Sequence, residues 1–297
     1  MRAVPAPDPL PGPAGFPAPL QRAVSDSEAG YPEGLRELRD APPTIYLRGT
    51  IPPLGRAVAI VGSRAASPYG LAMAGRLAAD LARLGFAVVS GLARGIDAAA
   101  HAAALDAGGT TVAVLPCGLD SITPRHHRAL AARVAERGGL LSEWESGEPR
   151  ARAVFVRRNR LIAALASAVV VVEAAEISGA LSTAAAARRL RRAVLAVPGD
   201  VDRPTARGCH ALIRSGAALC ETAGDIVRAL PSRAAVPGPE ARLLEALEAE
   251  PHGIEALAER AGLAVADALS ALLHLQWAGA AEARPGQRWV KSAGRGT

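Results

Sequence analysis

The sequence predicts an α/β protein: a doubly wound, mostly parallel sheet of the Rossmann-like type with a small C-terminal winged-helix domain. Two observations predict the sheet. Short runs rich in β-branched residues alternate with Ala-rich helical stretches, and these runs are continuously apolar, as in strands buried on both faces. A third observation predicts the second domain: a Pro-rich break follows residue 230, and helical patterns and a hairpin pattern lie beyond it.

The first domain is expected to span residues 31–230, after a flexible Pro/Ala-rich arm at residues 1–30. It opens with a short helix near residues 31–35 and a strand at residues 45–49. We expect core strands at residues 58–61, 87–90, 111–115, 140–142, 168–172 and 194–197. Helices are expected between them at residues 71–83, 97–107, 125–137, 156–166 and 180–191.

The C-terminal part begins with a linker at residues 231–239, which is rich in Pro. Residues 240–297 contain two helical patterns, then a helix at about residues 264–277, and a hairpin pattern at residues 280–284 and 288–291. This order is typical of a winged helix. The helix before the hairpin contains no Lys or Arg, so we expect protein docking or weak duplex binding rather than sequence reading.

Composition narrows the function classes only in part. The chain has 297 residues, a formal net charge of +6 and one lysine, Lys291, so its basic character comes from arginine and is a weak pointer to nucleic acid. Its three cysteines lack metal-site spacing, which predicts no metal site and fits the cytoplasm. The apolar runs are shorter than the roughly 18 residues that cross a bilayer, so we expect no membrane partner.

Glycine-containing turns follow the predicted strands and point to phosphate binding. Backbone N–H groups and helix N-termini at such turns favour anions, and Arg64 and Arg94 each add a guanidinium fork. None of the turns reads GxGxxG or GxxxxGK[ST], which argues against a dinucleotide enzyme and an ATPase. The turns lie at residues 62–64, 90–95, 116–118, 178–183 and 198–200.

The densest basic segment is residues 150–160, which carries five arginines around Phe155 and Asn159. An aromatic ring among guanidiniums suits single-stranded nucleic acid, because a base stacks on the ring while the arginines contact the backbone. A buried Phe155 with solvated arginines is the simpler alternative. The arginines are Arg150, Arg152, Arg157, Arg158 and Arg160.

A series of motifs resembles the DNA-processing protein A (DprA/Smf) family over about residues 31–230. The motifs are Ala-Ile-Val-Gly-Ser-Arg, Ser-Gly-Leu-Ala-Arg-Gly-Ile-Asp, Val-Leu-Pro-Cys-Gly-Leu-Asp, Leu-Ser-Glu, Phe-x-x-Arg-Asn-Arg-Leu-Ile, Val-Val-Glu, Ser-Gly-Ala-Leu-Ser-Thr-Ala and Ala-Val-Pro-Gly. The resemblance implies a homodimeric, sequence-independent binder of single-stranded DNA that protects the strand and helps to load the RecA recombinase in natural transformation or recombination. It implies neither catalysis nor a cofactor.

The resemblance also assigns DNA-binding residues by motif position. They are Gly62, Ser63, Arg64, Ser90, Gly91, Arg94, Gly95, Arg152, Phe155, Arg158, Asn159, Arg160, Ser178 and Gly179. The chain departs from the family pattern at Val156, where many relatives have Pro, and at Ser63, where Thr is common. We also expect the Pro-rich arm to replace the helical-repeat domain that often precedes this fold in the family.

Two enzyme alternatives stay open at this point. Phosphoribohydrolases of similar shape carry a Pro-Gly-Gly-x-Gly-Thr turn and a catalytic Glu, whereas residues 178–183 lack the double glycine and the acid. Ser90, Asp97 and His101 form a catalytic triad only if they converge. We expect instead that Asp97 caps its helix and that His101 makes a buried polar contact.

Overall fold

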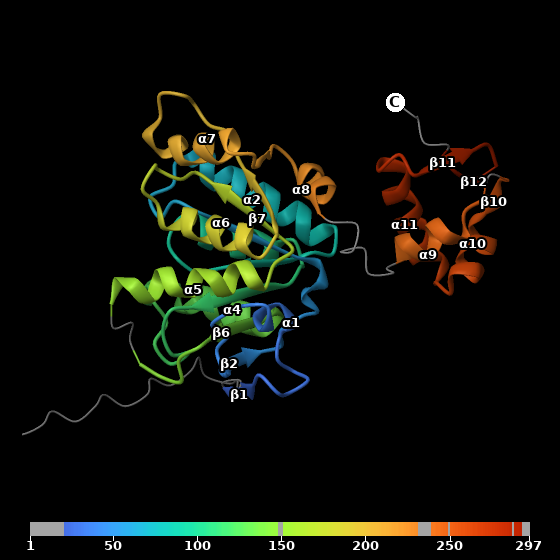
Figure 1. Ribbon diagram of the computed structural model, residues 1–297. Helices are drawn as coiled ribbons and strands as arrows, with labels where there is room; N and C mark the ends of the chain where they lie inside the picture. Colours follow the sequence, from blue (N-terminus) through green and yellow to red (C-terminus); the bar gives the residue numbers. More distant parts are fainter. Residues whose placement is uncertain (1–20, 148–150, 231–238, 249, 287, 293–297) are drawn as a thin grey trace, which may run out of the picture. The chain divides into compact units, whose positions relative to one another are not determined.

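The computed structural model describes residues 21–147, 151–230, 239–248, 250–286 and 288–292. The chain divides into two units, residues 1–231 and 232–297, and each is described by itself (Figure 1). Among the described residues, no helix has the length and apolar character needed to span a membrane. The predicted linker at residues 231–239 falls almost wholly outside the described part of the chain.

The first unit is built on one sheet with the strand order β1-β2-β6-β5-β4-β3-β7-β8-β9 among its described residues. The strands from β6 to β9 in this order pair in parallel, and β2 and β1 are added antiparallel at the β6 edge. The strands are β1 (Arg22–Ser25), β2 (Thr44–Gly49), β3 (Ala57–Gly62), β4 (Ala87–Ser90), β5 (Thr111–Leu115), β6 (Gly139–Ser142), β7 (Ala168–Val172), β8 (Ala193–Ala196) and β9 (Ala218–Leu219).

Helices cover both faces of this sheet, as the continuous apolar strands predict. In Figure 1, α5 and α6 lie side by side over one face. The helices are α1 (Glu33–Arg36), α2 (Pro68–Arg83), α3 (Ile96–Asp106), α4 (Arg128–Arg137), α5 (Arg152–Ala164), α6 (Gly179–Arg189), α7 (Arg207–Arg214) and α8 (Ala223–Ala229). Short 3₁₀ turns are η1 (Leu54–Arg56), η2 (Arg125–His127) and η3 (Pro204–Ala206).

The side chains of alternate strand residues pack into hydrophobic clusters on opposite faces of the sheet. Both faces are therefore covered by helices. On β3, Ala59 and Val61 pack with α5 and α6, whereas Val58 and Ile60 pack with α2 and α3. All four side chains are essentially inaccessible to solvent. The doubly wound prediction is confirmed, and the core strands lie within a residue or so of their predicted ranges.

The prediction that residues 1–30 form a flexible arm is wrong for residues 22–25. Residues 22–25 form β1, which pairs with β2 through backbone hydrogen bonds and places Val24 in the core. The sequence signal is weak because this strand has four residues and lies at the edge of the sheet. Residues 1–20 lie outside the described part of the chain.

The second unit has the winged-helix layout that the sequence predicts. Its strands pair in the order β10-β12-β11, and Leu257, Leu272 and Trp289 are among its core residues. The helix α11 also exposes Leu269 and Trp277. The elements are α9 (Pro239–Ala246), β10 (His252–Gly253), α10 (Ile254–Ala261), α11 (Val265–Trp277), β11 (Ala281–Arg284) and β12 (Arg288–Lys291).

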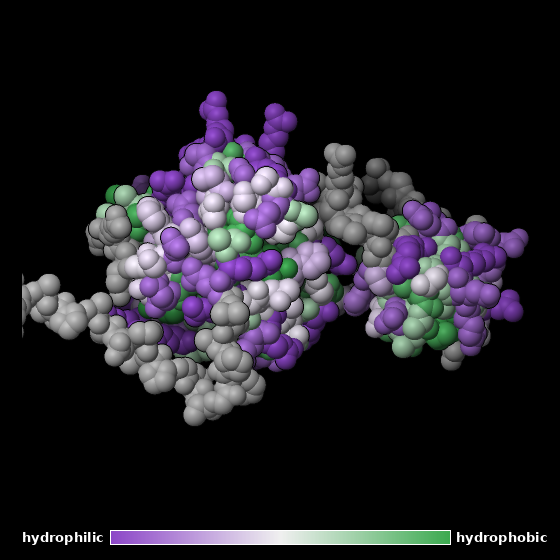
Figure 2. Space-filling model, turned by 90° about the horizontal axis from the view of Figure 1, so that it is seen from below, coloured by the Kyte–Doolittle hydropathy of each residue, from purple (hydrophilic) through white to green (hydrophobic). Residues whose placement is uncertain are grey.

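The order of the strands marks where a ligand belongs. The chain winds from β3 through β4 and β5 to β6 on one side, and then returns through α5 to β7 on the other side of β3. Open α/β sheets bind ligands at the carboxyl ends of the strands next to such a reversal. Figure 2 shows one face of the molecule, on which hydrophilic residues predominate over the first unit and apolar residues appear in small patches.

Candidate functional site

The turn after β3 brings together two residues that the sequence analysis singles out. Arg64 follows β3 at the point where the winding reverses, and its side chain is exposed. Its guanidinium carbon lies 4.9 Å from the centroid of the half-buried Phe155 ring on α5. A guanidinium at this distance is attracted to the ring face. The structure thus places an exposed cation beside an aromatic ring, from segments about ninety residues apart in sequence.

Glycines allow the turns after β3 and β4 to pack against each other. Gly95 has a φ of +77°, and a side chain there would clash with the carbonyl oxygen of Ser63. The N–H of Ile96 donates to the same oxygen at 3.2 Å. Gly62 lies so close to β7 that a Cβ would overlap the carbonyl of Val172. The backbone position of Arg64 is therefore set by contacts that only glycine permits.

The N-terminus of α2 already holds an internal anion. Glu173, directly after β7, is buried, and its carboxylate accepts a hydrogen bond from the N–H of Ser67 at 2.8 Å and another from the Ser67 hydroxyl. Ser67 is the N-cap of α2. The expectation that this helix end holds a phosphate is corrected, because a carboxylate of the chain itself occupies it.

In the turn after β4, a carboxylate of the chain itself also binds the backbone N–H groups. The Oδ2 of Asp97 accepts hydrogen bonds from the N–H groups of Gly91 at 3.1 Å and Ala93 at 3.3 Å. Burial raises the pKa of the Asp97 carboxyl, while the charge of Arg158 and these N–H groups act in the opposite direction. The prediction that the 90–95 turn offers its N–H groups to phosphate is therefore wrong in part. Asp97 binds the turn before its helix, whose N-cap is Gly95.

Arg158 is buried, which contradicts its predicted contact with DNA. Its Nη1 donates to the carbonyl oxygens of Gly91, at 2.8 Å, and Val114. Gly91 makes room for this guanidinium, because a Cβ there would clash with it. Burial lowers the pKa of Arg158 to about 10, so the group stays charged at neutral pH. Arg158 therefore ties α5 to the ends of β4 and β5.

The next two residues of the Arg-Asn-Arg motif are also held internally. Asn159 donates to the carbonyl of Gly179 at 3.0 Å and to the Ser182 hydroxyl at 2.8 Å, which fixes α6 against α5. Arg160 pairs with Asp40 at 2.7 Å and with Glu143 at 2.8 Å, and its side chain is mostly buried. Their predicted phosphate contacts are corrected, because both side chains support the position of α5.

The remaining predicted residues lie at the same carboxyl edge of the sheet. Arg94 is exposed in the turn before α3, Gly179 is exposed at the start of α6, and Ser178 is the N-cap of that helix. Arg152 begins α5, although its side chain is outside the described part, as is all of Arg150. The exposed side chains of this edge include Arg64 and Arg94, and we name the pair of Arg64 and Phe155 the Arg64–Phe155 site.

The structure does not form the Ser-His-Asp triad. Ser90 is buried and donates to the carbonyl of Ile60 at 2.6 Å, and the Nδ1 of His101 lies 2.7 Å from the hydroxyl of Thr111. Thr111 in turn donates to the carbonyl of Val88, so it accepts from the histidine. Burial lowers the pKa of His101 to about 3. The predicted buried polar contact of His101 is confirmed.

Three acidic residues organise this edge, of which Glu143 and Glu173 stand in the quoted motifs without a predicted role and Asp40 was not predicted. Glu143 and Glu173 each follow a buried strand directly, and Asp40 lies before β2. A carboxylate immediately after a buried apolar strand is a signal that could have indicated an internal anion at a helix end. Glu143, whose side chain is 6% exposed, receives both Arg157 at 3.1 Å and Arg160.

Comparisons with known proteins find a matching family and similar sequences. Residues 22–231 match the family model described as DNA recombination-mediator protein A, and residues 227–287 match the DprA winged helix domain. The chain is 47% identical over 256 residues to a putative DNA processing protein DprA of Mycobacterium tuberculosis, which covers 81% of the chain and 66% of that relative's length. It is 39% identical over 281 residues to protein Smf of Escherichia coli, covering 88% of the chain and 75% of that protein.

Two solved structures are similar to the fold. DNA processing protein A of Streptococcus pneumoniae matches with a TM-score of 0.66 and 36% identity, covering 71% of this chain and 74% of that one. DNA processing protein A of Helicobacter pylori, whose structure is described for its single-stranded DNA binding mode, matches with a TM-score of 0.63 and 28% identity. That match covers 70% of this chain and 94% of the other.

Proposed function

The chain belongs to the DNA recombination-mediator protein A (DprA/Smf) family, and from this premise we propose that it binds single-stranded DNA without sequence preference. The observation that carries the proposal is the Arg64–Phe155 site, in which an exposed guanidinium lies 4.9 Å from a half-buried aromatic ring. The H. pylori relative supports it, because the structure of that protein is described for its single-stranded DNA binding mode.

In this proposal, each member of the site has its own task. Arg64 contacts a backbone phosphate, for which a guanidinium is suited in charge and geometry. Phe155 stacks a base, and every base has a face that can stack, so the interaction is tolerant of sequence. Arg94, exposed in the neighbouring turn, gives a second backbone contact. Arg158 and Asn159 position α5 and therefore Phe155 through their buried hydrogen bonds.

Internal carboxylates explain why this edge favours a strand over a nucleotide. Glu173 occupies the N–H of Ser67 at the N-terminus of α2, and Asp97 occupies N–H groups of the turn before α3, which would otherwise be open to a phosphate. Their hydrogen bonds to backbone and to Ser67 also commit them to structure rather than to acid–base chemistry. This supports binding rather than hydrolysis, so we assign the chain no reaction and no cofactor.

The wider role follows from the family. We place the protein in the cytoplasm, where it protects incoming or processed single strands and helps to load the RecA recombinase during natural transformation or recombination. We assign it a homodimer as the working form. These assignments rest on family membership. The chain spans 66% of the length of the mycobacterial relative.

The proposal is tested by fluorescence anisotropy with a labelled oligonucleotide in single-stranded and duplex form. We expect tighter binding of the single strand, and a loss of about 1–3 kcal/mol in Phe155→Ala with an unchanged salt dependence, because stacking releases no counterions. Val156→Ala is the matched control, since Val156 is the exposed neighbour on α5. Duplex preference, or wild-type affinity in Phe155→Ala, contradicts the proposal.

A further inference from the structure

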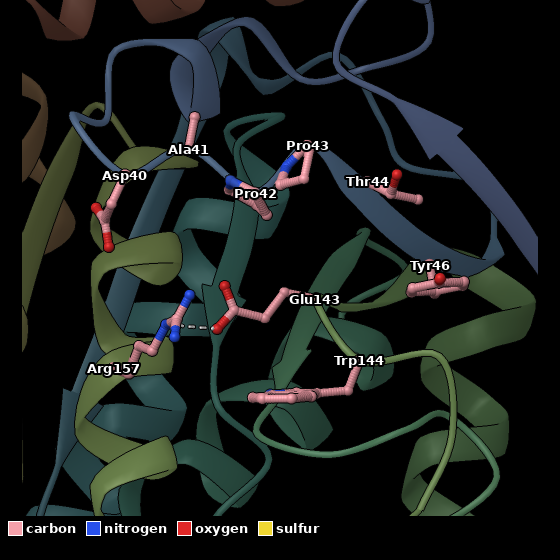
Figure 3. Close-up of a pocket in the computed structure, with 9 residues that line it drawn as sticks. All are labelled: Asp40, Ala41, Pro42, Pro43, Thr44, Tyr46, Glu143, Trp144 and Arg157. Atoms are coloured by element: carbon pink, nitrogen blue, oxygen red, sulfur yellow. Dashed lines mark ion pairs between the residues drawn. The ribbon is translucent and has the colours of Figure 1, made fainter.

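A cavity opens on the same edge of the sheet, and neither Arg64 nor Phe155 lines it. It has a volume of about 310 Å³, near the lower limit of small-molecule pockets. Figure 3 shows the flat Trp144 ring on one side of the cavity, with Tyr46 across from Arg157 and the two prolines Pro42 and Pro43 above. The aromatic and proline side chains form the apolar part of the cavity wall.

The remaining wall carries charges of both signs. Arg157 pairs through its Nε with Glu143 at 3.1 Å, and its side chain is 56% exposed. Asp40 also lines the cavity, is 61% exposed and pairs with Arg160. The wall itself therefore holds two carboxylates and one guanidinium, that of Arg157, while Arg160, which does not line the cavity, pairs with both carboxylates. A wall with more carboxylates than guanidiniums does not favour a bare phosphate, whereas it suits the polar edge of a flat, neutral ring.

The position of the cavity relates it to the proposed strand. Glu143 and Trp144 follow β6 directly, and β6 is three strands from β3 in the sheet. At about 4.8 Å per strand this separation is about 14 Å. A stacked strand rises about 3.4 Å per nucleotide, so about four nucleotides cover the distance. The helix α5 carries Phe155 and Arg157 in its first turns and thus borders both places.

We propose that this cavity is a second base subsite, which takes one base of the strand that is bound at Arg64 and Phe155. The base stacks on Trp144, and Arg157 donates a hydrogen bond to an oxygen or ring nitrogen of its edge. Every base offers such an acceptor, so the subsite keeps the binding independent of sequence. This inference rests on the proposed function, because it concerns a further contact of the same strand.

Photocross-linking with the unmodified protein tests the inference directly. Thymines of a twelve-nucleotide oligothymidylate are replaced one at a time by 5-iododeoxyuridine, and the adducts are mapped by mass spectrometry. We expect adducts on Phe155 and on Trp144 from positions up to about four nucleotides apart. Adducts on Phe155 alone overturn the second subsite and leave the proposed function standing. An absence of both binding and adducts contradicts the proposed function itself.

Two variants measure what the subsite contributes. We expect Trp144→Ala to weaken binding of the twelve-nucleotide strand by about five- to 150-fold, the range of one lost base stack. Trp277→Ala is the control, because Trp277 is 89% exposed and lies in the second unit. Arg157→Gln tests the charged part of the wall and leaves the Trp144 ring in place. We expect it to lower the affinity for the strand less than Trp144→Ala does. Wild-type affinity in a folded Trp144→Ala protein overturns the inference.

Discussion

At the scale of single residues, Arg64 and Arg158 have the same side chain and opposite surroundings. Arg64 is exposed over the ring of Phe155, whereas Arg158 is 4% exposed and donates to the carbonyls of Gly91, just after β4, and Val114 in β5. The motif identifies both as important, but it does not say which one faces solvent. That depends on how α5 is rotated against the sheet, which tertiary packing decides.

The buried position of Arg158 predicts a stability defect. Arg158→Ala leaves the carbonyls of Gly91 and Val114 without this donor and removes the positive charge beside Asp97. We expect a loss of about 3–5 kcal/mol in the free energy of unfolding, measured by urea denaturation. Arg157→Ala, one residue away and exposed, is the control and should cost less than about 1 kcal/mol. Equal losses in the two variants would show that Arg158 is not a buried tie.

Because His101 is buried, we expect the free energy of unfolding to depend on pH. The pKa of His101 is lowered from the ordinary value of 6.5 to about 3 in the folded state, chiefly by burial. Because the unfolded chain binds the proton more readily, the stabilising contribution is present above pH 6.5 and is lost as the pH falls toward 3. Between pH 7 and pH 5, the wild type should lose about 2 kcal/mol that is absent in His101→Asn.

Asn is chosen for this variant because its amide can replace the Nδ1–H donor to Thr111 and does not titrate. The measurement is urea denaturation of both proteins at the two pH values. Parallel losses in the two proteins would mean that His101 titrates normally in the folded state.

At the scale of elements, the turns after β3 and β4 pack directly against each other. Gly95 has a φ of +77° and a ψ of −124°, a conformation that other residues rarely adopt, and it lies against the Ser63 carbonyl. We expect Gly95→Ala to cost at least the roughly 1–3 kcal/mol of such backbone strain and to weaken DNA binding by displacing Arg64. Thermal unfolding and anisotropy measure the two effects.

Gly85 supplies the matched comparison. It has a φ of +76°, and a Cβ there meets nothing within 4 Å. Gly85→Ala should therefore cost about 1 kcal/mol and leave DNA binding unchanged. If Gly95→Ala binds DNA as well as Gly85→Ala does, the close packing of the two turns does not position Arg64.

The elements were predictable because each core strand is a continuous apolar run between glycine-containing turns. The strands β4, β5 and β7 have the predicted bounds. The signal fails for β1, whose four residues at the sheet edge show no such run. The start of α5 was also missed, because its basic first turn, from Arg152, reads as a loop.

At the scale of the whole molecule, the winding of the sheet decides which residues meet. Arg64 and Phe155 come together because β3 lies beside β7, so that α5 returns over the point where the winding reverses. The sequence predicted the edge on which the site lies and both members of the Arg64–Phe155 site. It did not predict that Glu173 binds the N-terminus of α2, and it placed Asp97 as a helix cap, whereas Asp97 binds the turn before α3; a carboxylate's partner depends on distances across the sheet.

The salt dependence of single-stranded DNA binding in Arg64→Ala tests the phosphate contact of Arg64 most directly. Anisotropy titrations of the wild type, Arg64→Ala and the control Arg83→Ala are made across a series of salt concentrations. Arg83 lies at the far end of α2 and pairs with Asp80. We expect Arg64→Ala to bind more weakly and its salt slope to fall by about 0.7, the value of one lost phosphate contact, while Arg83→Ala matches the wild type. Wild-type affinity and slope in Arg64→Ala would contradict the site.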